Sequence, residues 1–414
     1  MVTNGCIFNK HRLYKLPLGL LSEDPMLSHE VNEEMTRVGR ATPAGELLRR
    51  YWQPIAAEAE ITEESPKLRV RALGEDLVLY KNAQGQLGLV EEQCPHRSAS
   101  LYYGFIEQDG LRCPYHGWKF DCAGNCIEQP FEPSDSPLKN ESKVRAYPVQ
   151  ALGGMIWAYM GPAPAPLLPR WEQLLRNDGV RKVFILPVIE CNWLQIMENS
   201  CDPAHTYYLH AHTLTLKGKG DSGAYYYRPI EKLHFETVDE PNWTGVTKQR
   251  IYGGEQAEEE EGHPVIFPNY LLSPQREHIV MHMRLPVDDT HTKIFRYQFT
   301  PNDDGSPVIQ PNIIPYEQVP PVKDENGVYH MNNFASHDAM AWETQGPITD
   351  RSRETLGSSD VGIAQYRRLL REQIRAVQDG RDPKGVIRDP ALNDCIRINV
   401  STGQRRMARE LAKA

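Results

Sequence analysis

The sequence predicts an α+β protein in which a small, mostly antiparallel β domain precedes a larger part that mixes strands and helices. Two observations support this prediction. Between about 53 and 160, short strand-like segments alternate with turn signals such as the one at 82–85. From 170 onward, longer strand-like segments at 278–285 and 292–300 occur together with helical stretches. A chain of 414 residues is long enough for about two or three domains.

The individual elements follow in chain order. A short helix is expected from Pro43, because Thr42 is a suitable N-cap and proline fits the first helical position. Strands are expected at 77–80, 87–90 and 155–159.

Near the end of the chain, 360–379 is predicted to be an amphipathic helix, because apolar residues recur there at helical spacing before Gly380. A proline-rich stretch at 162–169 reads as a stiff linker. We therefore divide the chain into an N-terminal extension (1–41), a β domain (42–161) and an α+β domain (162–414).

Composition excludes several classes of protein. The net charge of −9 argues against a nucleic-acid-binding protein. No apolar run approaches the roughly 18 residues of a membrane-spanning helix, and the apolar stretch at 16–21 is too short for a signal peptide. Eight cysteines in so long a chain do not suggest a disulfide framework. We expect a soluble, cytoplasmic protein.

The β domain contains a first candidate metal site. Cys94 and His96 form a C-x-H pair, and Cys113 and His116 form a C-x-x-H pair sixteen residues later. Zinc accepts two sulfurs and two nitrogens, but C-x-H spacing is unusual for zinc knuckles. A [2Fe–2S] cluster of the Rieske kind fits better, because two cysteines there hold one iron and two histidines hold the other.

Two further cysteines, Cys122 and Cys126, follow this motif and are predicted to be free thiols.

A second candidate site lies downstream, where Asp202, His205 and His210 form a D-x-x-H-x-x-x-x-H string. Residues five apart are about 140° apart around a regular α-helix, so the two histidines would not share one face. The helix must therefore loosen between them, and Pro203 already disfavours helical geometry at Asp202. Such irregularity is compatible with a metal site.

The two motifs together resemble the Rieske non-heme iron aromatic-ring hydroxylating oxygenases, large (alpha) subunit. The resemblance runs from about 42 to the end and includes the stretches 287–292 and 338–351, which are most similar to the phthalate- and phenoxybenzoate-dioxygenase branch. It implies a Rieske [2Fe–2S] domain followed by a catalytic domain of antiparallel sheet and helices, of the helix-grip type.

The resemblance also implies residue roles. Cys94 and Cys113 would bind one cluster iron, and His96 and His116 the other. Mononuclear Fe(II) would be bound by two histidines and one carboxylate, namely His205, His210 and Asp338. Asp202 would bridge the two centres across a subunit boundary and carry electron transfer.

Asp288 and Asp289 are rivals for the carboxylate ligand, but they precede a strand and read more naturally as turn residues.

The implied activity is that of a terminal oxygenase, which uses O2 and electrons from a separate flavin and iron–sulfur reductase to hydroxylate an aromatic, acid-like substrate. The family forms homo-oligomers built from trimers. Two alternatives stay open: a monooxygenase that removes O-methyl groups or cleaves aryl ethers, and a Rieske electron carrier without an active site. A zinc-binding interaction module is the remaining option.

An anionic substrate would require an arginine near the iron, and the sequence offers Arg228, Arg250, Arg276 and Arg284 without distinguishing among them. Each reads more simply as a surface ion-pair partner or a strand residue.

Overall fold

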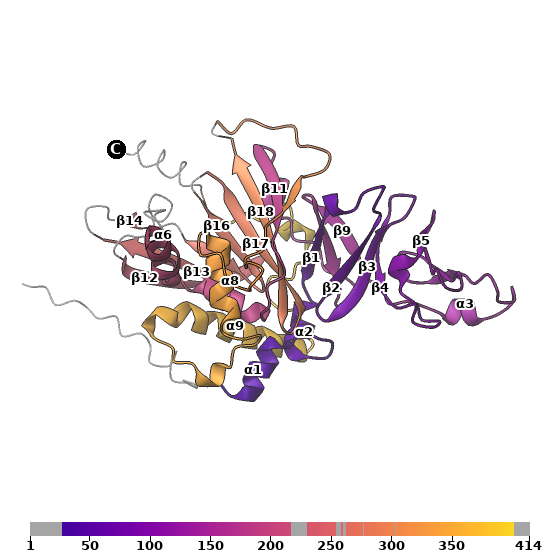
Figure 1. Ribbon diagram of the computed structural model, residues 1–414, viewed down its shortest axis with the longest axis horizontal. Helices are drawn as coiled ribbons and strands as arrows, with labels where there is room; N and C mark the ends of the chain where they lie inside the picture. The colour runs from indigo at the N-terminus through magenta and orange to yellow at the C-terminus, as the bar shows by residue number, and fades with distance from the viewer. Residues whose placement is uncertain are drawn as a thin grey trace, which may run out of the picture.

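The structure is a computed structural model that describes residues 27–216, 230–253, 258–259, 262–275, 277–302 and 304–400. Figure 1 shows a large central sheet with helices along one side, and a smaller group of β-sheets that extends away from it. Arg228 and Arg276, two of the arginines considered above, lie outside the described residues. In the described parts of the chain, no helix is both long enough and apolar enough to cross a membrane.

The N-terminal half is built from small antiparallel sheets, as predicted. One sheet has the order β1 (Trp52–Ala57), β10 (Met155–Tyr159), β9 (Val149–Leu152). A second has the order β2 (Lys67–Ala72), β3 (Glu75–Lys81), β4 (Leu87–Glu91). A third joins the short strands β5 (Phe105–Ile106), β6 (Leu111–Arg112), β7 (Lys119–Phe120) and β8 (Cys126–Glu128). The predicted strands at 77–80, 87–90 and 155–159 are thereby confirmed.

Strand β3 is buried on both faces. Leu77 and Leu79 point into the main hydrophobic core, whereas Val78 and Tyr80 belong to a separate core beneath the β5–β8 sheet. This division follows from the two-residue period of a strand. The sheet β2–β3–β4 is therefore a wall between the two cores.

The C-terminal half contains the large sheet. Within the described residues it has nine strands, eight of them in the order β12-β13-β15-β16-β17-β18-β11-β19, with β14 paired to β13. Their bounds are β11 (Gly179–Ile185), β12 (Ile230–Glu240), β13 (Trp243–Tyr252), β14 (Glu258–Glu259), β15 (His263–Ile266), β16 (Tyr270–Pro274), β17 (Ile279–Asp288), β18 (His291–Pro301) and β19 (Tyr316–Gln318). All pairs are antiparallel except β11 with β19, which is parallel.

Helices lie along the large sheet (Figure 1). The main ones are α1 (His29–Thr36), α2 (Pro43–Leu48), α5 (Trp193–Cys201), η4 (Thr206–His212), α8 (Phe334–Glu343) and α9 (Val361–Gln378). Shorter helices occur throughout the described chain, and α3 lies in the lobe that carries β5 (Figure 1). They are η2 (Glu58–Glu60), η3 (Leu101–Tyr103), α3 (Leu138–Glu141), α4 (Glu172–Leu175), α6 (Thr213–Leu216), η6 (Arg351–Arg353), η7 (Ser358–Asp360) and η8 (Pro390–Leu392).

Two of these helices match the sequence predictions closely. The Thr42 side chain caps α2 by accepting a hydrogen bond from the Gly45 N–H. Helix α9 buries the predicted apolar stripe, including Tyr366 and Ile374, in the main core. An amphipathic helix gains most of its stability from such burial.

The small sheet β1–β10–β9 shares the main core with the large sheet. The Tyr270 hydroxyl of β16 donates a hydrogen bond to the Trp52 carbonyl oxygen at 2.9 Å, and the Tyr270 and Trp157 rings meet edge to face at 6.4 Å. The boundary at 161/162 therefore runs through packed side chains, and the domain limits at 41 and 161 remain predictions.

Candidate metal centres

The first candidate site is formed by two short loops of the β5–β8 region. In the loop after β4, the Cys94 N–H donates to the Ala99 carbonyl at 2.9 Å. In the loop between β6 and β7, the Cys113 N–H donates to the Trp118 carbonyl at 2.8 Å. Gly117 has a φ of +73°, a conformation that other residues rarely adopt, so it closes the second loop directly after His116.

The loops bring together the four predicted ligands. Cys94 and Cys113 are buried, whereas His96 is exposed and stacks on Trp118 with ring centroids 4.6 Å apart. The His96 and His116 rings lie 4.5 Å apart at 64°. Two buried cysteine sulfurs and two more exposed imidazoles are the donor set that a Rieske cluster requires.

The environment of the sulfurs also fits a metal. Burial raises the pKa of the Cys94 thiol to about 12, and the neighbouring Cys113 thiol acts in the same direction. The Cys94 sulfur would therefore be a thiolate only with a cation bound to it. Cys122 and Cys126 are free thiols, as predicted.

The second candidate site begins where α5 ends. Asp202 leaves helical geometry, with φ −97° and ψ 111°, in front of Pro203. The chain then continues as the π-helix η4, which begins directly after His205. Hydrogen bonds in a π-helix run from i to i+5, so residues five apart come close to alignment. The predicted loosening between the two histidines is thus confirmed and has a defined form.

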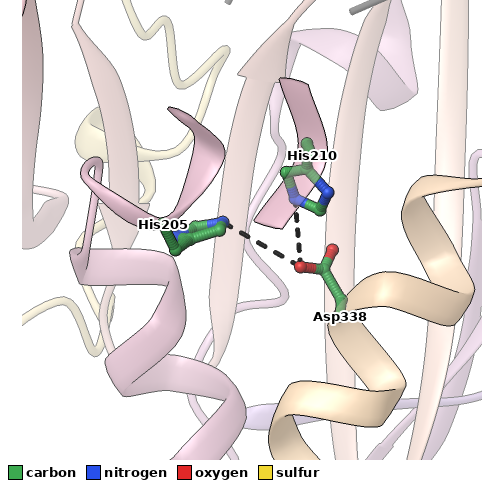
Figure 2. Close-up of side chains that lie close together, drawn as sticks. All are labelled: His205, His210 and Asp338. Carbon is green, nitrogen blue, oxygen red and sulfur yellow. Dashed lines mark ion pairs between the residues drawn. The ribbon is translucent and has the colours of Figure 1, made fainter. Parts of the chain in front are cut away.

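Helix α8 carries Asp338, the third predicted ligand. Figure 2 shows both imidazoles directed toward Asp338. Asp338 Oδ1 lies 3.2 Å from His210 Nε2 and 3.9 Å from His205 Nε2. One ligand atom from each of the three residues lies within 4.8 Å of the others. Two imidazoles and one carboxylate in this arrangement can bind iron(II) and leave coordination positions open.

The environment of Asp338 favours a bound cation at this centre. Asp338 Oδ1 is buried and has no hydrogen-bond partner among the described residues. Burial would raise the pKa of Asp338, but its electrostatic interactions with His210 and His205 outweigh burial, so the carboxyl pKa is lowered. A buried carboxylate oxygen without a hydrogen-bond partner is costly unless a positive ion lies beside it. The residues therefore fit a divalent metal.

Other side chains contact the two predicted histidine ligands at Nδ1, the ring nitrogen that faces away from Asp338. Asp202 Oδ2 lies 3.5 Å from His205 Nδ1, on the side of the ring opposite Asp338. On His210, Nδ1 lies 3.2 Å from Nδ1 of the buried His337. His337 was not among the residues predicted from the sequence, although a histidine directly before the candidate carboxylate was a usable signal. Such contacts fix the orientation of metal ligands.

The rival carboxylates lie elsewhere. Asp288 accepts a hydrogen bond from the Thr290 N–H at the β17–β18 turn, and Asp289 accepts one from the Val38 N–H. Asp289 lies in the turn, as predicted, whereas Asp288 is the last residue of β17. Arg250 and Arg284 are strand residues, but the alternative of a surface position is wrong, because they are only 2% and 3% exposed.

Comparisons with known proteins agree with both sites. The Rieske [2Fe-2S] domain family matches residues 51–148, and the family described as LigXa C-terminal domain like matches 323–396. The oxygenase subunit of 5,5'-dehydrodivanillate O-demethylase from Sphingobium sp. is 41% identical over 381 residues, which cover 90% of this chain and 86% of the relative. The chain belongs to the Rieske oxygenase alpha subunits.

Other members of this family are similar over comparable lengths. The phthalate 4,5-dioxygenase oxygenase subunit of Pseudomonas putida is 31% identical, with 87% of this chain and 89% of the relative covered. Among solved structures, the oxygenase in an oxygenase–ferredoxin complex of carbazole 1,9a-dioxygenase has a TM-score of 0.62 at 18% identity, covering 90% of this chain and 100% of that chain. This Rieske oxygenase alpha subunit is a non-heme iron oxygenase whose cofactors are a [2Fe–2S] cluster and a mononuclear iron.

Proposed function

We propose that the protein is the terminal oxygenase of a Rieske system and hydroxylates an aromatic, acid-like compound with O2 and electrons from a separate reductase. The observation that carries this proposal is that one chain holds two candidate metal centres. His96 and His116 meet at the Cys94 and Cys113 loops, and His205, His210 and Asp338 converge on a second point. Relatives are named for phthalate, phenoxybenzoate and 3-chlorobenzoate, all aromatic carboxylates.

The residue roles are part of the proposal. Cys94 and Cys113 bind one cluster iron, and His96 and His116 bind the other. His205, His210 and Asp338 bind the mononuclear iron, which supplies O2 activation when it is bound. The proximity of these three side chains supports their assignment.

Electron transfer is proposed to cross a subunit boundary in a homo-oligomer of trimers. Within one chain, the β5–β8 lobe and helix α8 lie well apart, with the small sheets between them (Figure 1). This separation supports a neighbouring subunit as the source of the electron. Asp202, behind His205, would bridge the two centres by hydrogen-bonding His116 of the neighbouring copy.

The electron donor is proposed to be a separate flavin and iron–sulfur reductase, and the compartment to be the cytoplasm. The oxygenase–ferredoxin complex among the structural neighbours supports an external donor.

O-demethylation of an aryl methyl ether is a second candidate, favoured by the O-demethylase relative at 41% identity. A Rieske electron carrier is disfavoured, because the cluster of His205, His210 and Asp338 would then have no use.

Reconstitution tests these proposals. The holoprotein, mixed with a Rieske-oxygenase reductase and NADH, should consume O2 in the presence of an aromatic acid or aryl methyl ether, and it should contain about three irons per chain. Ring hydroxylation without formaldehyde supports the first candidate, whereas formaldehyde release supports demethylation. Two irons per chain and no oxygenated product from any compound would refute both and favour the electron carrier.

A further inference from the structure

The large sheet turns an unusually basic face toward the iron ligands. The Lys248 Nζ donates to the Asp202 carbonyl at 3.2 Å, and the Arg250 Nη1 donates to the Thr206 hydroxyl at 2.5 Å. On β17, the Arg284 Nη1 contacts the Met197 sulfur at 3.6 Å. These contacts reach α5 and the segment that carries the histidine ligands, so this face borders the metal centre.

Two further residues occupy the same face beside Arg284. His282 precedes Arg284 by two positions on β17, and Arg296 of β18 is the direct cross-strand partner of His282. Residues two apart and directly opposite residues share one face of a sheet, within reach of one another. The Asp338 charge acts on both Arg284 and Arg296, which places the arginines close to the iron ligands.

In the described part of the chain, no carboxylate pairs with either Arg284 or Arg296. Arg284 is 3% exposed and Arg296 is half-buried, and in both the Nε is buried without a hydrogen-bond partner. Among the described residues neither forms an ion pair. Burial lowers the pKa of both guanidinium groups, to about 10 in Arg284, although the Asp338 charge acts in the opposite direction.

Other buried arginines of this protein form ion pairs with a carboxylate. Arg351 is 0% exposed and Arg367 is 6% exposed, and both form ion pairs with Glu198, at 2.7 and 2.6 Å. Buried charge is costly unless it is paired. The positive charge beside the predicted iron ligands therefore calls for an anion that the described residues do not supply.

We propose that Arg296 and His282, with Arg284 behind them, bind the carboxylate of an aromatic substrate and thereby set the specificity of the iron site. The inference rests on the proposed function and names the group that the site recognises. A guanidinium matches a carboxylate through two parallel hydrogen bonds, and the neutral imidazole of His282 adds one donor. Phe184, the cross-strand partner of Arg296 on β11, lies with its ring 5.7 Å from the guanidinium and provides an apolar wall.

Direct binding tests the subsite without requiring turnover. The anaerobic holoenzyme is titrated calorimetrically with 4-phenoxybenzoate and 4-hydroxy-3-methoxybenzoate, and with the methyl ester of each. In Arg296→Gln, affinity for the acids should fall roughly ten- to hundredfold, because a charge-assisted hydrogen-bond pair is lost. Affinity for the esters should change less than about threefold, and Arg296→Lys should recover part of the affinity for the acids.

Lys293→Gln is the matched control. It removes one positive charge from the same strand, but Lys293 lies on the opposite face, where its Nζ is 4.8 Å from the Phe295 ring centroid. Its acid affinity should equal that of the wild type. Unchanged Rieske absorption and iron content verify that each variant is folded.

Equal losses for acid and ester in Arg296→Gln, or no loss for the acids, would overturn the proposal, as would a wild type that binds the esters and not the acids. Turnover is scored separately in the reconstituted system. A wild type that binds acids through Arg296 yet oxygenates nothing would refute the proposed function while leaving the subsite intact.

Discussion

Replacement of Glu198 by glutamine should destabilise the catalytic half of the protein strongly. Glu198 lies on α5, four residues before Asp202, and is 6% exposed. Its two carboxylate oxygens accept hydrogen bonds from the Arg351 Nε and Nη2, both at 2.7 Å, and a third comes from the Arg367 Nε at 2.6 Å. Glutamine keeps the shape but removes the charge, so two buried guanidinium groups lose their shared counter-charge.

Two independent estimates of the free energy of unfolding lost in Glu198→Gln agree. Removing one partner of a buried ion pair typically costs about 3–5 kcal/mol. Independently, burial would raise the pKa of Glu198, but Arg351 and Arg367 outweigh it and lower the pKa from 4.5 to about 2. That difference corresponds to roughly 3 kcal/mol.

The sign of the pH dependence follows from the lowered pKa of Glu198. Its contribution to stability is fully present above pH 4.5, the ordinary pKa, and is lost as the pH falls toward 2, the folded-state pKa. Glu198→Gln should therefore be less stable than the wild type at neutral pH, and the difference should shrink below pH 4.5.

The assay is urea unfolding of wild type and variant at pH 7 and at several acidic pH values, followed by far-UV circular dichroism. Glu354→Gln is the control, since Glu354 pairs with Arg367 alone and its side chain is 20% exposed. Its loss should be about 1 kcal/mol. If Glu198→Gln costs no more than Glu354→Gln, or if its effect is independent of pH, the reasoning about the buried network is wrong.

Three further predictions concern the metal centres. Asp338→Ala should lower the iron content from about three to about two per chain and leave the Rieske absorption intact; unchanged iron would remove Asp338 from the ligand set. Cys94→Ser should abolish the Rieske absorption while about one iron remains, measured by visible spectroscopy and metal analysis; a retained Rieske spectrum would contradict the assignment. Asp202→Asn should keep both iron centres but lose turnover in the reconstituted system, and near-normal product formation would show that Asp202 does not bridge them.

Much of the fold and of both candidate metal sites could be predicted from the sequence, because the sequence patterns that indicate them are local. The ligand pairs at Cys94 and Cys113 each lie within one tight loop, so their spacing alone reports the geometry. The irregular backbone between His205 and His210 followed from helical periodicity and from one proline.

The residues proposed to bind the substrate carboxylate could not be predicted from local sequence patterns. Arg296 was not among the arginines considered from sequence, because it reaches the iron site only through the register of β17 with β18. That register depends on how the chain turns between Asp288 and His291, and a shift by one residue would send the Arg296 side chain to the opposite face. Asp338 could be proposed only from a resemblance, since it lies on α8, far along the chain from His205 and His210.

The wall formed by β2, β3 and β4 has a mechanical consequence. Because Val78 and Tyr80 lie in the core beneath the cluster-bearing lobe while Leu77 and Leu79 of the same strand lie in the main core, a swing of the lobe would break buried contacts. The lobe is therefore held firmly to the rest of its own chain. In the proposed homo-oligomer, the distance an electron travels between neighbouring copies would then be set by how the subunits pack.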